Sequence, residues 1–180
     1  MKSPIGALLL FAVGCGVAAA PLSNAAEKPA AERRVAVTYV SPEKFTDFRS
    51  SGFGTATDKD LKYLTELFTN HLEKLAKQYL APDERLEVTF KDIDLAGRYE
   101  PEHGPSTQDV RICRDITYPR MSLSFRLLGS DGQVRAEGER TLKDMSYNMT
   151  ILPPTGDKEF RYDKELLNDW MRREFKKRKS

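Results

Sequence analysis

The sequence predicts an α+β fold, a single-domain sandwich in which a mostly antiparallel sheet of about four strands carries two helices on one face. Three observations support this prediction. Apolar residues recur every three or four positions over 57–80 and again over 163–175, the spacing of a helix that buries one side. Apolar and polar residues alternate in four other segments, which is typical of half-buried strands. Glycine and proline clusters separate these segments, and their order is β-α-β-β-β-α.

The first strand is predicted over residues 35–40 and ends at a Ser-Pro pair. Residues 43–56 have no steady period and form a predicted loop. Thr57 or Asp58 can cap the helix that follows, and Pro82 prevents that helix from continuing. Its apolar stripe consists of Leu61, Leu64, Leu67, Phe68, Leu72, Leu75, Ala76 and Tyr79.

A second strand is predicted over residues 86–91, where every other residue is apolar. The apolar phase then slips to Ile93, which predicts a β-bulge near Lys91-Asp92 or the end of the strand. Residues 97–108 form a long predicted loop, and loops of that length in compact domains are often functional.

The third and fourth strands form a predicted antiparallel hairpin. The strands cover residues 121–127 and 134–139, and the turn between them, 129–132, is rich in glycine. The last helix is predicted to start near Asp163 and to bury one side up to residue 175.

The N-terminus resembles a secretory signal. One basic residue precedes an apolar run that is too short to span a bilayer well, and small residues stand at positions 23 and 25. We therefore expect a signal peptide (1–25), a linker (26–32), one domain (33–175) and a basic tail (176–180). An exported protein would work where ATP and NAD are scarce, which disfavours chemistry driven by those cofactors.

The two cysteines lead to separate predictions about lipidation and thiol chemistry. Cys15 lies in the leader, in a weak match to the lipobox of bacterial lipoproteins, so lipidation is the less favoured alternative to simple cleavage. If the leader is removed, Cys113 has no intramolecular partner. It is then either a buried, inert thiol or an intermolecular or reactive one.

Four segments carry distinctive motifs, including Arg-Asp-x-x-Tyr-Pro-Arg within 109–120 and Asp-Trp-x-Arg-Arg-Glu-Phe at 169–175. The other two are 37–47 and 92–97. Together they resemble the signature of a family of secreted bacterial proteins known as a domain of unknown function. The resemblance covers nearly all of the expected mature chain. It implies a single domain in the cell envelope and brings no activity, ligand or catalytic residue.

Three carboxylates form the first candidate site. Asp92 and Asp94 stand two apart on an extended chain and would share a face, where Asp115 can join them if the strands are neighbours. Such a group can hold Ca²⁺ or Mg²⁺, or raise one pKa for acid–base chemistry. The alternative is a structural ion network with Arg111, Arg114 or Arg120.

Arginines form the second candidate site. Arg114 and Arg120 are an even number apart and would share a strand face, with Arg111 pointing the other way. Arginine captures carboxylates and phosphates bidentately, so these residues can read an anionic partner. Tyr118 belongs to the same motif and joins the predicted binding residues.

The basic run 172–179 can contact anionic lipid or simply be a solvated helix end. The formal net charge of +2 gives no sign of nucleic-acid binding. The sequence lacks a Gly-x-Ser-x-Gly nucleophile elbow, and its two histidines are too few for a zinc site. No cofactor, catalytic residue or metal ligand is assigned.

We therefore expect a non-enzymatic binding or accessory protein of the envelope, whose partner is an envelope protein or an anionic envelope component. The alternative is a carboxylate- or metal-dependent hydrolase of envelope polymers. An inhibitor of a secreted enzyme is a third possibility.

Overall fold

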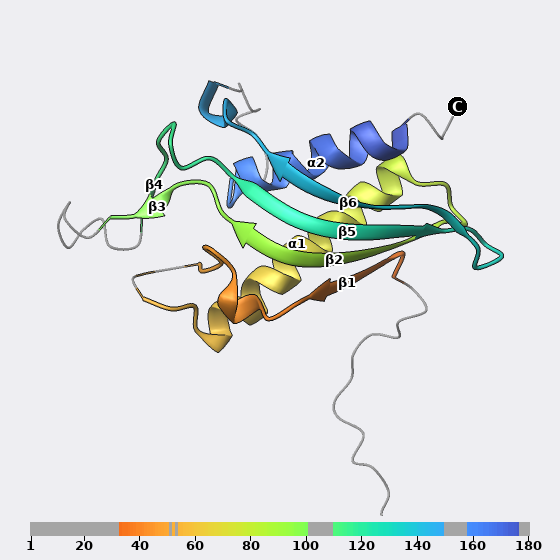
Figure 1. The fold of residues 1–180 in the computed structure, drawn as a ribbon, viewed down its shortest axis with the longest axis horizontal. Helices are drawn as coiled ribbons and strands as arrows, with labels where there is room; N and C mark the ends of the chain where they lie inside the picture. The colour runs from red at the N-terminus through yellow and green to blue at the C-terminus, as the bar shows by residue number, and fades with distance from the viewer. Residues whose placement is uncertain (1–32, 51, 53, 101–109, 150–157, 177–180) are drawn as a thin grey trace, which may run out of the picture.

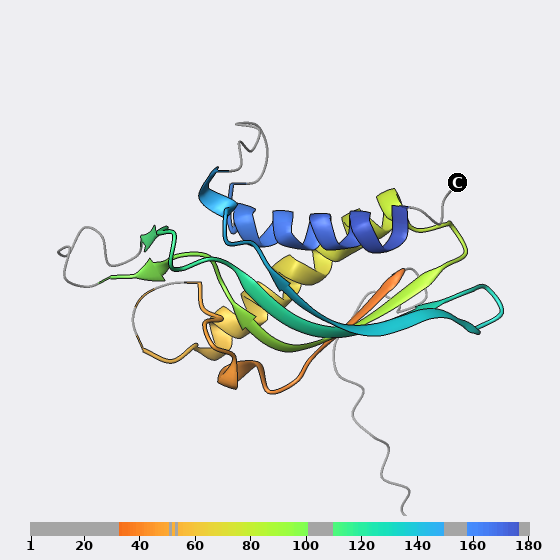
Figure 2. The same ribbon diagram turned by 45° about the horizontal axis from the view of Figure 1, so that its top comes forward.

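A curved four-stranded sheet forms one layer of the protein and two helices form the other (Figure 1). The structure is a computed structural model and describes residues 33–50, 52, 54–100, 110–149 and 158–176. Both helices pack on one face of the sheet, where they share a single hydrophobic core with its strands (Figure 2). The predicted α+β class is therefore confirmed. The strands stand in the order β1 (Val35–Tyr39), β2 (Arg85–Asp94), β5 (Arg120–Leu128) and β6 (Val134–Lys143).

Helix α1 (Asp58–Tyr79) is the long helix that the apolar stripe predicts. Phe68 and Leu72 of that stripe are fully buried. Thr57 rather than Asp58 caps the helix, because its hydroxyl accepts a hydrogen bond from the backbone N–H of Asp60 at 3.2 Å. The Asp60 carboxylate accepts one in return from the Thr57 N–H at 3.0 Å. This capping box satisfies two backbone donors that the helix leaves without partners.

Replacing Thr57 by alanine is expected to lower the free energy of unfolding by about 1 kcal/mol, because the capping hydroxyl is lost. Burial tends to raise the pKa of Asp60, but hydrogen bonds from Ser50 and Thr57 outweigh it and bring the pKa to about 2. The pKa of Asp60 should therefore be higher in the variant, because the hydrogen bond from the Thr57 hydroxyl is lost. Urea unfolding measures the first effect. Thr55→Ala, in the exposed segment before the cap, is the control, and equal stability of the two variants would contradict the role of Thr57.

Strand β1 runs parallel to β2, with Val37 opposite Val88. A parallel pair needs a crossover connection, and α1 supplies it. The remaining pairs, β2 with β5 and β5 with β6, are antiparallel. The register of β2 against β5 shifts between Phe90 and Asp92, which confirms the bulge predicted near Lys91-Asp92.

The hairpin β5–β6 is also confirmed, but β6 continues to Lys143 instead of ending at residue 139. The sequence does not predict residues 140–143 as strand, because Arg140, a charged residue, occupies a position that faces the core. Its guanidinium lies over the Phe125 ring at 5.2 Å and pairs with Glu174 of α2 at 2.8 Å. Arg140 thus covers one end of the core with its side chain.

Helix α2 (Arg161–Phe175) begins two residues before the predicted start at Asp163. Phe160 precedes it in the left-handed conformation, with φ of 46°, and makes no side-chain cap. The Trp170 indole packs edge-on against the rings of Phe125 and Phe175, at 5.7 and 5.8 Å.

Two short strands, β3 (Arg98–Tyr99) and β4 (Arg111–Ile112), form a separate antiparallel pair. The predicted loop 97–108 therefore begins as a strand, which is too short to show an alternating pattern. The 3-10 helices η2 (Pro42–Lys44) and η5 (Tyr147–Met149) complete the fold. The predicted leader and linker lie outside the described residues. None of the helices described is both long and apolar enough to cross a membrane.

Candidate functional site

A cluster of aspartates and arginines lies where β2 ends. Asp47 and Asp94 form an isolated parallel bridge there. The backbone N–H of Asp47 donates to the Ile93 carbonyl at 3.0 Å, and the N–H of Leu95 donates to the Asp47 carbonyl at 3.2 Å. The bridge therefore holds two carboxylates, each about 95% or more buried, beside each other at one edge of the sheet.

Three arginines neutralise Asp47. Its carboxylate lies 2.5 Å from the Nη2 of Arg111 and 3.2 Å from nitrogens of both Arg49 and Arg98. Two arginines neutralise Asp94, namely Arg98 at 2.6 Å and Arg120 at 2.5 Å. Arg98 therefore bridges the two carboxylates, and each buried negative charge has more than one cationic partner. This is the arrangement that buried ions require.

Arg111 is the most enclosed of these arginines, with a side chain only 11% exposed. It donates hydrogen bonds to the carbonyls of Ala96 at 3.0 Å and Gly97 at 2.9 Å, and it stacks over the Tyr99 ring at 4.9 Å. Burial tends to lower the pKa of Arg111, but the Asp47 carboxylate outweighs burial and the pKa is raised. The sequence left open whether Arg111 binds a partner or joins a structural ion network, and the structure pairs it with Asp47 in the interior.

Gly97 must be glycine for this packing to form. Its φ is +77°, and a Cβ at this position would lie 2.9 Å from the Ile112 carbonyl oxygen. A larger residue would separate the turn after β2 from β4 and would move the carbonyls that Arg111 binds.

Asp163 of α2 is buried beside the cluster, with 1% exposure. Its carboxylate accepts a hydrogen bond from the Ala96 N–H at 2.9 Å. Burial raises its pKa to about 7, although this hydrogen bond and the charge of Arg111 act in the opposite direction. A pocket of about 290 Å³ opens there, lined by Tyr99, Arg111, Cys113 and Phe160 among others. The sequence analysis did not single out Asp163, which it treated only as the start of a helix.

Replacing Asp163 by asparagine is expected to flatten the pH dependence of stability. The folded pKa lies above the ordinary value of 3.8, so the folded protein holds the extra proton and the group contributes stability at low pH. That contribution is complete below about pH 4 and falls by at most about 1.4 kcal/mol per pH unit as the pH rises to 7.

Urea unfolding at pH 5, 6 and 7 measures the slope. The free energy of unfolding of the variant should vary less with pH than that of the wild type. Equal slopes for Asp163→Asn and the wild type would contradict the raised pKa.

The three candidate carboxylates are held apart by different partners. Asp94 is enclosed by arginines, as the ion-network alternative predicted. Asp92 accepts hydrogen bonds from the N–H and hydroxyl of Thr46, at 2.7 and 2.9 Å. Asp115 lies in an exposed turn and accepts from the Asn148 amide. The expectation that Asp115 joins the other two is wrong, because the chain leaves β4 before Asp115 and enters a turn. Among the residues described, no group of three His, Cys, Asp or Glu side chains is placed to hold a metal ion.

Arg114 and Arg120 do not share a strand face, so that prediction is also wrong. Arg120 begins β5, and its guanidinium lies 5.5 Å from the half-buried Tyr118 ring. Arg114 lies in the preceding turn, closed by the Thr117 N–H donating to its carbonyl, and pairs with Glu100 at 2.6 Å. A turn separates the two arginines. An even spacing in sequence places two residues on the same face only within one continuous strand.

Cys113 is exposed, so the expectation of a buried thiol is wrong. Partial burial of its sulfur nevertheless raises its pKa, and a raised pKa disfavours the reactive thiolate. The tail 176–180 lies outside the described residues except for Lys176, and Arg172 before it pairs with Asp169.

Large apolar side chains project from the turns next to the cluster. Ile116 is 83% exposed, Met145 is 62% exposed and Met149 is 79% exposed. Their two segments are joined by hydrogen bonds from the Tyr147 hydroxyl to the Arg114 carbonyl, at 2.9 Å, and from Asn148 to Asp115. The sequence analysis missed these residues, although Ile116 stands out as an apolar residue inside a polar, non-periodic motif.

Comparison with known proteins gives the family of the chain. Neither a curated protein nor a solved structure matches it. A family model described as "Protein of unknown function (DUF3016)" matches residues 33–173, and its description names no activity or ligand. The span agrees with the expected single domain and with the resemblance to a family of unknown function. The chain belongs to the DUF3016 family.

Proposed function

We propose that this protein is a non-enzymatic binding or accessory protein of the bacterial envelope. Its contact surface, which we call the motif surface, consists of residues 110–118 and 143–149. The observation that carries the proposal is the exposure of Ile116, Met145 and Met149 on two adjoining segments. Solvent-exposed apolar groups that lie together usually mark an interaction site, and methionine adapts to varied partners.

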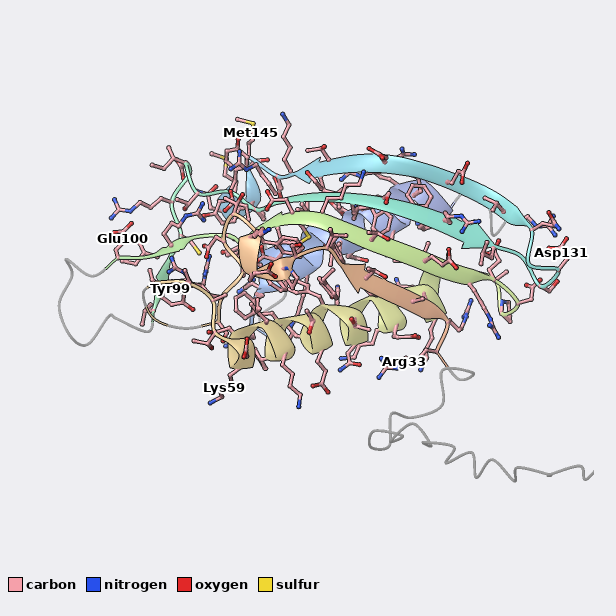
Figure 3. The ribbon with its side chains drawn as sticks, turned by 60° about the horizontal axis from the view of Figure 1, so that its bottom comes forward. Arg33, Lys59, Tyr99, Glu100, Asp131 and Met145 are labelled. Carbon is pink, nitrogen blue, oxygen red and sulfur yellow. The ribbon has the colours of Figure 1, made fainter. Side chains whose placement is uncertain are left out.

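The cluster of ion pairs supports this proposal by fixing the turns that form the surface. Arg111 anchors β4 to Asp47 and to carbonyls at the end of β2, and Arg120 anchors the start of β5 to Asp94. The first segment of the motif surface, 110–118, therefore contains one anchor near its start and ends two residues before the other. Figure 3 places Met145 at the same end of the molecule as Tyr99 and Glu100, far from Asp131 at the other end. A rigid base lowers the entropy that binding must overcome.

The same geometry assigns different tasks to the arginines of the motif. Arg111 and Arg120 are committed to buried carboxylates, so their replacement would disturb the fold together with any binding. Replacing an exposed side chain on the motif surface can change binding without disturbing the fold. We therefore choose Ile116 as the probe position.

The experiment places a photo-crosslinking amino acid at Ile116 in the full-length protein expressed in its bacterial host. The matched control carries the same amino acid at Val134, which is 41% exposed in β6. Irradiation is expected to give a discrete crosslinked protein from Ile116 and none from Val134. Ile116→Ser should lower the yield of a crosslink placed at Met149. Equal crosslinking at both positions, or none at Ile116, would contradict the proposed surface.

The proposed location has an independent test. Export with cleavage after Ala25 predicts a mature chain that begins at Ala26 and is found in the envelope fraction. Mass spectrometry of the native protein measures its N-terminus and any lipid on Cys15. A chain that begins at Met1 in the cytosol would contradict export and would leave the crosslinking result to be judged separately.

A further inference from the structure

A groove runs along the outer edge of β1, at the other side of the sheet from β6. Figure 3 shows β1 lying between β2 and α1, with Arg33 at one end of the strand. The groove has a volume of about 790 Å³. Strand β1 lines it with Val35, Val37 and Tyr39, and β2 contributes residues 85–87. The lining residues from α1 are Lys62, Thr65, Glu66, Thr69 and Asn70.

The backbone of β1 offers free hydrogen-bonding groups to this groove. The backbone N–H and C=O groups of Arg34 and Val40 face β2. The Leu86 N–H donates to the Arg34 carbonyl at 2.9 Å, and the Val40 N–H donates to the Phe90 carbonyl at 3.0 Å. The N–H and C=O of one residue point to the same side of a strand, and the side alternates from one residue to the next. Those of Val37 and Tyr39 therefore point outward, away from β2. Glu73 satisfies the outward N–H of Val35 at 2.9 Å, and no such side chain covers Val37 or Tyr39 in the part of the chain described.

Three arginines gather at one end of the groove. Arg33, Arg34 and Arg85 line the groove there, and none of them has an ion pair among the described residues. Arg34 is half-buried, donates to the Ala81 carbonyl, and has a buried Nε without a hydrogen-bond partner. Arginines elsewhere in the sheet, such as Arg126 and Arg140, are paired with glutamates. Two carboxylates also line the groove, Glu66 on α1 and Glu87, which is the partner of Arg126. Asp83 and Glu84 line an adjoining hollow with the three arginines, and the described residues include no ion pair between these carboxylates and the arginines.

We propose that this groove binds an extended, acidic segment of a partner protein as an added strand beside β1. The outward peptide groups of Val37 and Tyr39 would bond to the backbone of the segment, and its acidic side chains would lie against Arg33, Arg34 and Arg85. Natural edge strands are usually blocked by charges, proline or a covering element. An open edge next to a groove is the geometry of strand addition, in which the backbone supplies affinity and side-chain contacts supply specificity.

The test uses fluorescent peptides of about eight residues with alternating valine and threonine, which end in two aspartates, two lysines or two serines. Fluorescence anisotropy measures binding to the whole protein. Amide NMR shifts and hydrogen exchange at Val37 and Tyr39 locate the binding. We expect the aspartate peptide to bind more than about tenfold tighter than the lysine peptide, and we expect both amides to become protected.

Two variants test the two parts of the proposal. Val37→Pro removes an outward N–H from an edge strand, where proline is tolerated, and Arg33→Gln combined with Arg85→Gln removes two exposed charges. Each should lower the affinity for the aspartate peptide by about tenfold or more. Arg173→Gln, which removes an exposed charge on α2, should leave this affinity unchanged. Circular dichroism checks that each variant is folded, and the arginine variant tests the proposal even if Val37→Pro unfolds.

Three results would overturn the proposal. They are absence of binding by all three peptides, equal binding of the aspartate and lysine peptides, and binding that leaves the Val37 and Tyr39 amides unprotected. A dimer that forms in the absence of peptide and is lost in Val37→Pro would make a second copy the occupant and would also overturn it. None of these results bears on crosslinking at Ile116.

Discussion

Replacing Asp47 by asparagine is expected to lower the free energy of unfolding by about 3–5 kcal/mol. Asp47 is the partner of Arg111, whose side chain is 11% exposed, and a buried ion that loses its partner is strongly destabilising. Arg49 and Arg98 also bind Asp47, but they are more exposed and can turn toward water. The cost therefore comes mainly from the Arg111 charge, which the variant leaves buried without a full counter-charge.

Asp92→Asn is the matched control. Asp92 is also an acceptor near the end of β2, but its partner is the exposed Thr46, so its loss should cost about 1 kcal/mol. Chemical denaturation of both variants measures the difference. A cost for Asp47→Asn no larger than that for Asp92→Asn would mean that the cluster is well hydrated in solution.

Replacing Phe68 by alanine is expected to cost about 3–5 kcal/mol, the range for an aromatic residue removed from a packed core. Phe68 is fully buried at the centre of α1. Its ring stacks near that of Phe48 at 6.1 Å and lies 6.3 Å from that of Phe160. The substitution would thus leave a cavity between three segments that are far apart in sequence.

Thermal and urea unfolding of Phe68→Ala measure this cost, and Phe68→Leu should recover a large part of the loss because it refills most of the volume. Lys74→Ala, on the exposed side of α1, should change stability by less than about 0.5 kcal/mol. A small effect of Phe68→Ala together with a large effect of Lys74→Ala would place the core on the wrong side of the helix.

Local patterns account for the parts of the fold that the sequence predicts well. The stripe through Phe68 defines α1 because tertiary burial and helical period agree over many turns. The hairpin β5–β6 is predictable because both strands alternate and a short glycine turn joins them. The bulge at Lys91-Asp92 follows from a change of apolar phase. Each of these signals lies within one continuous stretch of the chain.

Long-range pairing limits what the sequence predicts about the candidate site. Arg111 and Asp47 are far apart in the chain, and the pattern around each gives no sign that they meet. The motifs that contain them are recognisable, but the sequence leaves two interpretations of their arginines open, anion binding and a structural ion network, because it does not show which carboxylates lie within reach. Arg120 shows the same limit, since its partner Asp94 was among the candidates and only their register in β2 and β5 joins them. Parallel pairing of β1 with β2 also depends on where α1 delivers the chain.

The break between β1 and Asp47 has a consequence for the edge of the sheet. After Tyr39 the chain leaves β2, forms η2 and returns to it only at Asp47, so the exposed ladder is limited to the five residues of β1. Five residues of strand span about 17 Å. Such a short template cannot extend into a long intermolecular ladder, which protects the protein from fibril growth through this edge while leaving room for one brief stretch of foreign backbone.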